Sequence, residues 1–137
     1  MKANNGLITQ EDLALYEAEE QDVIHGTYRG YDIYAMAPPS SGGVALVEML
    51  NILEGFNLKE MGHNSALYAH ILTEAMRRAY ADRAKHIGDP NFNPDMPIER
   101  LTSKAYADEI RASIEMYFMN WSNSAKKKRL MAKKCLG

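Results

Sequence analysis

Near the N-terminus, the pattern of polar and apolar residues predicts a short helix followed by a β-hairpin. A variant of the capping box that begins at Thr9 predicts a helix over residues 10–17. Two segments rich in β-branched and aromatic residues, 23–28 and 31–36, flank a two-residue turn that ends on Gly30. Because glycine readily adopts the positive φ that such turns require, we expect the two segments to pair as antiparallel strands.

The middle of the chain predicts two long helices. Residues 44–54 are apolar on nearly every side of a helix, so this helix must be buried almost all round, and we expect Gly55 to end it. Ser65 is the expected N-cap of a second helix over residues 66–87. The apolar stripe expected on this second helix consists of Tyr68, Leu72, Ala75, Met76, Ala79 and Tyr80. A polar ladder in steps of four, predicted to form a salt-bridged face in solvent, consists of Glu74, Arg78, Asp82 and His86.

Glycine and proline separate the last predicted element from these helices. Gly88-Asp89-Pro90 is expected to break the second long helix, and a loop follows as far as Arg100. Residues 101–103 are expected to cap a last helix that runs to about Tyr117. Together these elements predict an α+β fold that is mostly helical with one β-hairpin.

The composition fits one soluble globular domain. The chain has 137 residues, of which 46% are hydrophobic and 25% are charged. No segment approaches the roughly 20 apolar residues of a membrane-spanning helix, and no signal peptide is visible, so a cytoplasmic location is expected for the chain as written. A single cysteine, Cys135, excludes an internal disulfide and a zinc site made of cysteines.

Charge divides the chain into two parts. Residues 1–119 hold ten basic and eighteen acidic residues, a net charge of −8, whereas residues 120–137 hold six basic residues and no acidic one, a net charge of +6. A basic terminus can bind nucleic acid or anionic lipid, but it is more often a solvated, disordered tail, and we interpret 120–137 in this way. The acidic body argues against nucleic acid as a partner.

Two groups of residues could carry chemistry. His70 and Glu74 lie one helical turn apart and could share a metal ion, but no third ligand lies nearby in the sequence, so a surface pair is the better interpretation. His86 fits the end of the polar ladder better than a catalytic base. Ser41, followed by two glycines at a helix start, could be a nucleophile or could help to bind an anion. Because its surroundings match neither the Gly-x-Ser-x-Gly elbow nor the P-loop, a tight strand-to-helix turn is favoured.

Six ordered strings of residues run through most of the chain. They are Gly-Leu-Ile-Thr-Gln-Glu-Asp-Leu from Gly6, Gly-Thr-Tyr-Arg-Gly-Tyr-Asp-Ile-Tyr from Gly26, Pro-Pro-Ser-Ser-Gly-Gly from Pro38, Asn-Ile-Leu-Glu-Gly-Phe from Asn51, Gly-His-Asn-Ser from Gly62, and Glu-Ala-Met-Arg-Arg-Ala-Tyr-Ala-Asp-Arg from Glu74 onward. Together they closely resemble the γ-glutamyltranspeptidase family over about residues 5–114.

The resemblance implies an N-terminal-nucleophile hydrolase with a four-layer αββα core, of which residues 1–119 resemble the C-terminal part of the large subunit. Family members are precursors that cleave themselves into two subunits and thereby free a catalytic Thr. Because that Thr, the oxyanion glycines and the Ser pair that binds the γ-glutamyl group belong to the small subunit, the resemblance assigns no catalytic, substrate-binding, cofactor-binding or metal-binding residue to this chain. Ser40 and Ser41 match the family's other Ser-Ser string. The residues of this region interpreted as structural are Gly30, Pro38, Pro39, Gly42 and Gly43.

For function, the resemblance implies a truncated fragment of an enzyme that transfers or hydrolyses the γ-glutamyl group of glutathione-like substrates. We expect it to be inactive alone, because the segment with the nucleophilic Thr is missing. Its expected partner is the small subunit or the remaining chain, and complete family members are usually periplasmic, secreted or exposed on the cell surface. The alternative is a non-catalytic helical protein-interaction module. In either case, apolar surface that missing layers leave uncovered could cause self-association.

Overall fold

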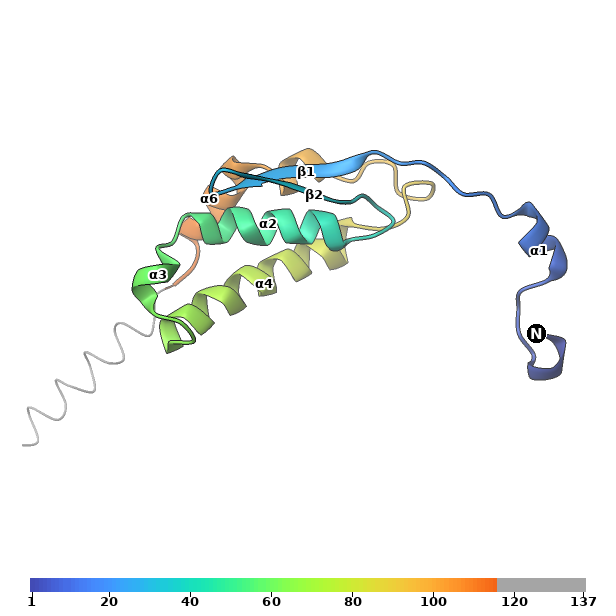
Figure 1. Ribbon diagram of the computed structural model, residues 1–137, viewed down its shortest axis with the longest axis horizontal. Coiled ribbons are helices and arrows are strands. Elements are labelled where there is room, and N and C mark those ends of the chain that lie inside the picture. Colours follow the sequence, from blue (N-terminus) through green and yellow to red (C-terminus); the bar gives the residue numbers. More distant parts are fainter. Residues whose placement is uncertain (116–137) are drawn as a thin grey trace, which may run out of the picture.

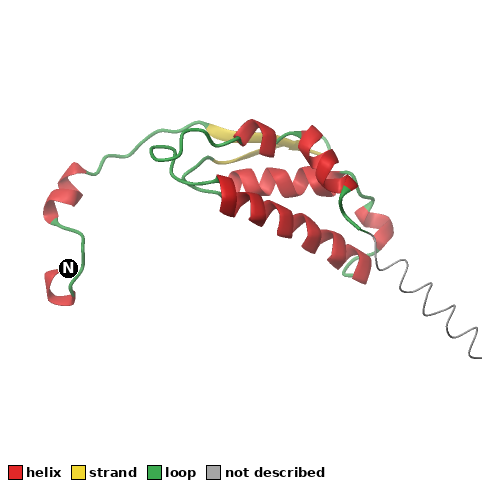
Figure 2. Ribbon diagram, turned by 180° about the vertical axis from the view of Figure 1, so that it is seen from behind, coloured by secondary structure: helices red, strands yellow, loops and turns green. Residues whose placement is uncertain are grey.

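Helix α2 (Gly42–Glu54) is the element against which the others pack in the computed structural model, which describes residues 1–115. A two-stranded hairpin lies against one side of α2 and the long helix α4 (Ala66–His86) against another (Figure 1). The two long helices run side by side when the molecule is seen from the front and from behind (Figure 2). The fold is therefore α+β, as the sequence predicts. The basic segment 120–137 lies outside the described residues.

The hairpin is formed by β1 (Val23–Tyr28) and β2 (Tyr31–Met36), which confirms the predicted strands. The two strands pair in antiparallel register along their whole length. Arg29 and Gly30 form the turn with φ angles of 49° and 86°. This left-handed backbone is the reason for a glycine at the second turn position, because a side chain there would be strained.

The two faces of the hairpin have different surroundings. On the inner face, Ile24 is buried and Ile33 packs beside it, against residues of α2. On the outer face, Val23 pairs with Met36, and Tyr34 lies two pairs further along, opposite His25. Tyr34 is 68% exposed and Met36 is 71% exposed. The described part of the chain therefore covers one face of the hairpin and leaves an apolar patch on the other.

The tip of the hairpin is anchored to the end of α2 by charged hydrogen bonds. The backbone N–H of Arg29 donates to Glu54 Oε1 over 2.6 Å. Lys104 donates to the other carboxylate oxygen of Glu54 and to the carbonyl oxygen of Thr27. The Lys104 hydrogen bond is the main reason why the pKa of Glu54 lies below its ordinary value. One carboxylate thus holds a strand turn and a distant lysine together.

Helix α2 confirms the predicted buried helix and begins two residues earlier than expected. Eight of its 13 residues are buried. The hairpin approaches its first turn so closely that a Cβ atom on Gly43 would lie 2.2 Å from the carbonyl oxygen of Met36. A Cβ atom on Gly26 of β1 would lie 2.6 Å from a methyl group of Val47. These two glycines allow the hairpin to pack directly on the helix.

Helix α4 confirms the predicted N-cap but not the whole apolar stripe. Ser65 Oγ accepts a hydrogen bond from the backbone N–H of Tyr68 at 3.1 Å, and the helix ends one residue earlier than predicted. Ala75 and Ala79 are fully buried, whereas Met76 is 41% exposed and Tyr80 is 53% exposed. Small residues let α4 approach α2 closely. The next positions along the helix are turned by about 100°, so their larger side chains point away from this contact.

The polar ladder Glu74, Arg78, Asp82 and His86 forms one predicted ion pair, between Arg78 and Glu74 at 3.3 Å, but not the predicted solvent face. All four residues are partly buried, and two of them bind the C-terminal part of the described chain. Arg78 donates to the carbonyl oxygen of Ser113 at 3.1 Å, and Tyr106 donates its hydroxyl to Asp82 at 2.6 Å. The prediction was wrong because these partners lie 24 to 35 residues away in the sequence.

The shorter helices were predicted unevenly. Helix α1 (Gln10–Leu15) has the expected capping box between Thr9 and Asp12 but ends before residue 17. The single-turn helices α3 (Leu58–Met61) and α5 (Ile98–Leu101), and the 3-10 helix η1 (Lys2–Asn4), were not predicted. Each is only one turn long, which is too short to leave a periodic pattern in the sequence.

Helix α6 (Lys104–Ala112) begins after its cap Ser103 but ends earlier than the predicted residue 117. At its C-terminus, the hydroxyl of Ser113 donates to the carbonyl oxygen of Ile110 at 2.7 Å. The carbonyl oxygen of Ile110 thus binds a side chain, as carbonyl groups at the end of a helix often do, and the helix ends there.

Two clusters of buried residues form the core, and α2 contributes to both. One cluster joins α2 to α4 and α6, and the other joins α2 to β1 and α5. By contrast, every residue from Ala3 to Val23 is exposed. In Figure 1 this N-terminal arm, residues 3–22, extends away from the rest of the described chain. The arm therefore contributes no buried apolar surface to the core.

The packing of α2 against β2 generates a test with a matched control. Gly43→Ala should lower the free energy of unfolding by about 2 kcal/mol, because the new methyl group would overlap backbone that cannot move freely. Gly42→Ala, one residue earlier, meets only Ser40 Oγ at 3.4 Å and should change it by less than about 1 kcal/mol. Urea unfolding of both variants measures the difference. Equal effects would show that the hairpin does not pack on α2 at this point.

Candidate functional site

The turn between β2 and α2 contains the serines and glycines that the sequence singles out. Pro38 is buried and Pro39 is exposed. Ser41 stands at the N-cap of α2, but its side chain does not cap the helix. Its Oγ instead accepts a hydrogen bond from Nε of Arg83 in α4 at 2.6 Å. Ser40 Oγ accepts a weaker bond from the N–H of Gly42 at 3.3 Å.

The partner of Ser41 decides what this hydroxyl can do. An arginine side chain has only donors and stays protonated, so Arg83 cannot accept the proton of a serine that attacks a substrate. In the described part of the chain, no histidine or carboxylate is bonded to Ser41. A serine nucleophile needs such a base within hydrogen-bonding distance. The geometry therefore fits a connection between α2 and α4 better than a nucleophile.

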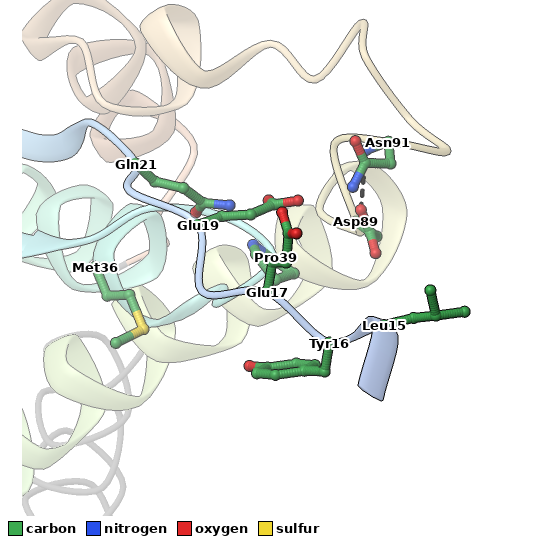
Figure 3. A pocket seen from close by; sticks show the side chains of 9 residues that line it. All are labelled: Leu15, Tyr16, Glu17, Glu19, Gln21, Met36, Pro39, Asp89 and Asn91. Carbon is green, nitrogen blue, oxygen red and sulfur yellow. Dashed lines mark hydrogen bonds between the residues drawn. The ribbon is translucent and has the colours of Figure 1, made fainter. Parts of the chain in front are cut away.

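An open groove lies beside this turn, between the N-terminal arm and the loop after α4 (Figure 3). It encloses about 830 Å³. Met36 and Pro39 line the groove on the side of the turn. Asp89 and Asn91 line it on the side of the loop, where the N–H of Asn91 donates to Asp89 Oδ1 at 2.9 Å. The arm contributes Leu15, Tyr16, Glu17, Glu19 and Gln21. Among the described residues, the lining includes no serine, cysteine or histidine, so these residues offer acidic, amide and apolar contacts but no serine or cysteine nucleophile with a base.

The structure also places the histidines that the sequence raised as candidates. Nε2 of His70 lies 3.0 Å from the carbonyl oxygen of Glu115. Glu74 binds Arg77 at 2.8 Å and Arg78 at 3.3 Å. The Arg77 hydrogen bond is the main reason why the pKa of Glu74 lies below its ordinary value. Among the described residues, no group of three or more metal-ligating side chains comes together.

A buried polar cluster in the core is the feature that sequence reasoning missed. Glu48 is 1% exposed and lies against Asp82 of α4. Burial, and secondarily the nearby Asp82, raises the pKa of Glu48 to about 8. Burial and the bond to Asp82 raise the pKa of Tyr106 to about 12. The sequence signal that could have revealed this cluster was a glutamate, Glu48, on a helix predicted to be buried on nearly every side.

Asn51, about one turn after Glu48, joins α2 to neighbouring elements of the same core. Its Nδ2 donates to the carbonyl oxygen of Thr102 at 2.7 Å, which ties α2 to the segment between α5 and α6. Its backbone carbonyl oxygen accepts a hydrogen bond from Arg111 of α6. Asn51 therefore binds neighbouring elements rather than a ligand in an accessible pocket.

No helix in the described part of the chain is long and apolar enough to cross a membrane.

Comparison with known proteins shows the family of the chain. The family model for gamma-glutamyltranspeptidase matches residues 1–133. The glutathione hydrolase proenzyme of Escherichia coli strain K12 is 51% identical over 116 residues, which are 85% of this chain and 20% of that protein. The acylase ACY 1 proenzyme of Pseudomonas sp. strain SE83 is 52% identical over 116 residues, which are 85% of this chain and 21% of that protein.

Solved structures agree with these sequence matches. The crystal structure of Helicobacter pylori gamma-glutamyltranspeptidase superposes with a TM-score of 0.78 and 45% identity, over 84% of this chain and 33% of that chain. The enzyme from Pseudomonas nitroreducens superposes with a TM-score of 0.77 and 36% identity, over 84% of this chain and 35% of that chain. The chain spans about a fifth of the length of the curated relatives that it matches. It belongs to the γ-glutamyltranspeptidase family.

Proposed function

We propose that this chain forms the C-terminal part of the large subunit of a γ-glutamyltranspeptidase, and that it contributes to catalysis only together with the rest of the enzyme. The observation that carries the proposal is the 51% identity to a glutathione hydrolase proenzyme over 116 residues that make up only 20% of that protein. The complete assembly would transfer the γ-glutamyl group of glutathione-like substrates to an amino acid or to water. The partner of the chain is the part that bears the nucleophilic Thr.

The role of this segment follows from its shape. It supplies one helical layer, with α2 and α4, and two strands of an adjoining sheet (Figure 1). In a four-layer αββα core, a second sheet packs on the face of the first sheet that its helices do not cover. On the outer face of the hairpin, the end away from the turn, with Val23, Tyr34 and Met36 exposed, has the apolar character that such a contact requires, and His25 and Asp32 bind each other beside it. We assign this face to the contact with the rest of the enzyme.

Inactivity of the isolated chain follows from the chemistry of acyl transfer. The reaction requires an activated nucleophile with a base, and oxyanion donors directed at the developing charge. The hydroxyl of Ser41 is bonded to Arg83, which cannot act as a base. The open groove beside it is lined by carboxylates and apolar residues. Neither arrangement supports attack on a γ-glutamyl bond.

Substrate selection is assigned to other parts of the enzyme. A relative named as an acylase and a relative named as a glutathione hydrolase match this segment equally well, at 52% and 51% identity. If this segment selected the acyl group of the substrate, one of these two relatives should match it clearly better than the other does. We therefore place the residues that recognise the substrate outside this chain.

A chimera tests the proposed function directly. Residues 1–115 of this chain should replace the matching segment of the Escherichia coli relative without loss of self-cleavage, because the chain supplies the same structural layer. The measurements are the appearance of two subunits on a denaturing gel and p-nitroaniline release from γ-glutamyl-p-nitroanilide. A chimera that is soluble and folded but remains an uncleaved precursor would contradict the proposal.

The isolated chain should release p-nitroaniline from the same substrate no faster than a mock preparation does. The reason is that the described residues bring together no nucleophile with a base: the hydroxyl of Ser41 is bonded to Arg83. Ser41→Ala is the matched control, because Ser41 is the residue that the sequence raises as a candidate nucleophile. Turnover above the mock level that Ser41→Ala abolishes would overturn both the inactivity of the chain and the structural role of Ser41.

The uncovered face of the hairpin should cause the isolated chain to self-associate. Contiguous exposed apolar patches are uncommon on soluble monomers, and the unpaired edges of a two-stranded hairpin can pair with another chain. Replacing Tyr34 and Met36 together by serine should reduce association in analytical ultracentrifugation and reduce the binding of the dye ANS. Phe92→Ser, at a loop position that is 89% exposed, should leave both unchanged. A monodisperse wild-type monomer that binds no dye would favour the self-standing module instead.

A further inference from the structure

Three helices meet at a buried pair of carboxyl groups that the proposed enzymatic role does not use. Glu48 belongs to α2 and Asp82 to α4, and the hydroxyl of Tyr106 in α6 donates to Asp82 Oδ2 at 2.6 Å. Glu48 is 1% exposed, and Asp82 and Tyr106 are partly buried. The cluster therefore lies where α6 joins the two long helices.

A close approach of Glu48 to Asp82 favours a proton on one of the two groups. Asp82 is the neighbouring acid that, after burial, raises the pKa of Glu48. An ionised carboxylate is only an acceptor, so two ionised carboxylates cannot bond to each other, whereas a protonated one can donate. Oε1 of Glu48 is buried and has no hydrogen-bond partner among the described residues. A full negative charge on this side chain would be poorly compensated.

No cation of the surrounding helices α4 and α5 forms an ion pair with Glu48 among the described residues. In α4, a terminal nitrogen of Arg78 pairs with Glu74, while its Nε is buried without a hydrogen-bond partner, and Arg83 donates to Ser41. In α5, Arg100 lies 4.2 Å above the ring of Tyr106 and so faces the phenol rather than Glu48.

The two strands of the hairpin and α2 itself offer no counter-charge either. On the hairpin, His25 and Asp32 bind each other on the outer face, away from α2. In α2, Asn51 is occupied with Thr102. No ion pair found among the described residues includes Glu48 or Asp82, so the two carboxyl groups have each other as their neighbouring ionisable acids.

We propose that Glu48 and Asp82 share one proton that fastens α6 to α2 and α4, so that loss of this proton at mildly alkaline pH loosens the contact among the three helices. Like charges in a buried site repel, and Tyr106 can neutralise neither carboxylate. The device acts on α6, the last helix of the described chain, and is independent of where the catalytic nucleophile comes from.

The pH range follows from the two states of Glu48. Its ordinary pKa is 4.5, and in the folded chain burial and Asp82 raise the pKa to about 8. Between these values the folded state holds a proton that the unfolded state has released. The stabilisation is therefore complete below pH 4.5 and is lost as the pH rises to about 8, and the unfolding equilibrium constant increases by up to about tenfold per pH unit.

Other shifted carboxyl groups act in a different range. The pKa values of Asp12, Glu54 and Glu74 are lowered by hydrogen bonds to Thr9, Lys104 and Arg77. Their stabilisation is present above the ordinary pKa values of 3.8 to 4.5 and is lost on acidification. They therefore do not produce a loss of stability above pH 5.

The test is urea unfolding of the full chain at low concentration from pH 5 to pH 9, compared with Glu48→Gln. Glutamine has the shape of a protonated glutamic acid and keeps a donor for Asp82, but it does not titrate. The wild-type unfolding constant should rise by about tenfold per pH unit relative to that of Glu48→Gln below pH 8. The histidines are common to both proteins, so their contribution cancels in the ratio.

A matched control and a direct measurement complete the test. Glu60→Gln changes an exposed glutamate of α3 and should keep the wild-type pH dependence. Carbon NMR of the glutamate carboxyl groups should show one resonance that titrates near pH 8 in the wild type and disappears in Glu48→Gln. An unchanged ratio of unfolding constants between wild type and Glu48→Gln across this range, or a spectrum in which every glutamate titrates below pH 6, would overturn the proposal.

Discussion

The burial of α2 on nearly every side is the constraint on which the rest of the fold depends. Eight of its 13 residues are buried, so the hairpin, α4, α5 and α6 all have to reach it. The hairpin does so because Gly43 and Gly26 have no Cβ atom. Helix α4 does so through alanines, and the segment before α6 does so through the hydrogen bond of Asn51 to Thr102. Each neighbour has local features that serve the same close approach.

The described chain buries part of its apolar surface and leaves another part exposed. One of the two buried clusters beside α2 includes the inner face of the hairpin, whereas the outer face and the N-terminal arm remain exposed. This asymmetry fits a chain that spans about a fifth of the length of its relatives.

The sequence predicted those elements whose signals are local. The hairpin follows from β-branched residues around Arg29-Gly30, and the starts of α1, α4 and α6 follow from capping residues whose hydrogen bonds span three residues. It predicted Ala75 and Ala79 on the buried side of α4, but it did not predict that Arg78 and Asp82 are partly buried, because their partners lie 24 to 35 residues away in the sequence. Gly55 ends α2 as expected, but with a φ of −74°, and its missing Cβ makes room for the side chain of Arg111.

The candidate site shows the same difference between local sequence signals and contacts between distant residues. The Pro-Pro-Ser-Ser-Gly-Gly string is visible in the sequence, but the bond from Arg83 to Ser41 joins residues 42 positions apart. The pairing of Glu48 with Asp82 is likewise a contact between two helices. A polar residue on an otherwise apolar helix was the available signal, and only the packing shows that it faces a second carboxyl group.

Native-state hydrogen exchange of the isolated chain tests the central position of α2 most directly. Amides that exchange only through global unfolding belong to the most stable part of a structure. Our account predicts that the slowest amides lie in α2, around Ile52, with those of the hairpin, α4 and α6 exchanging faster. Slowest exchange in α4 or in the hairpin, with α2 less protected, would contradict the claim that the other elements depend on α2.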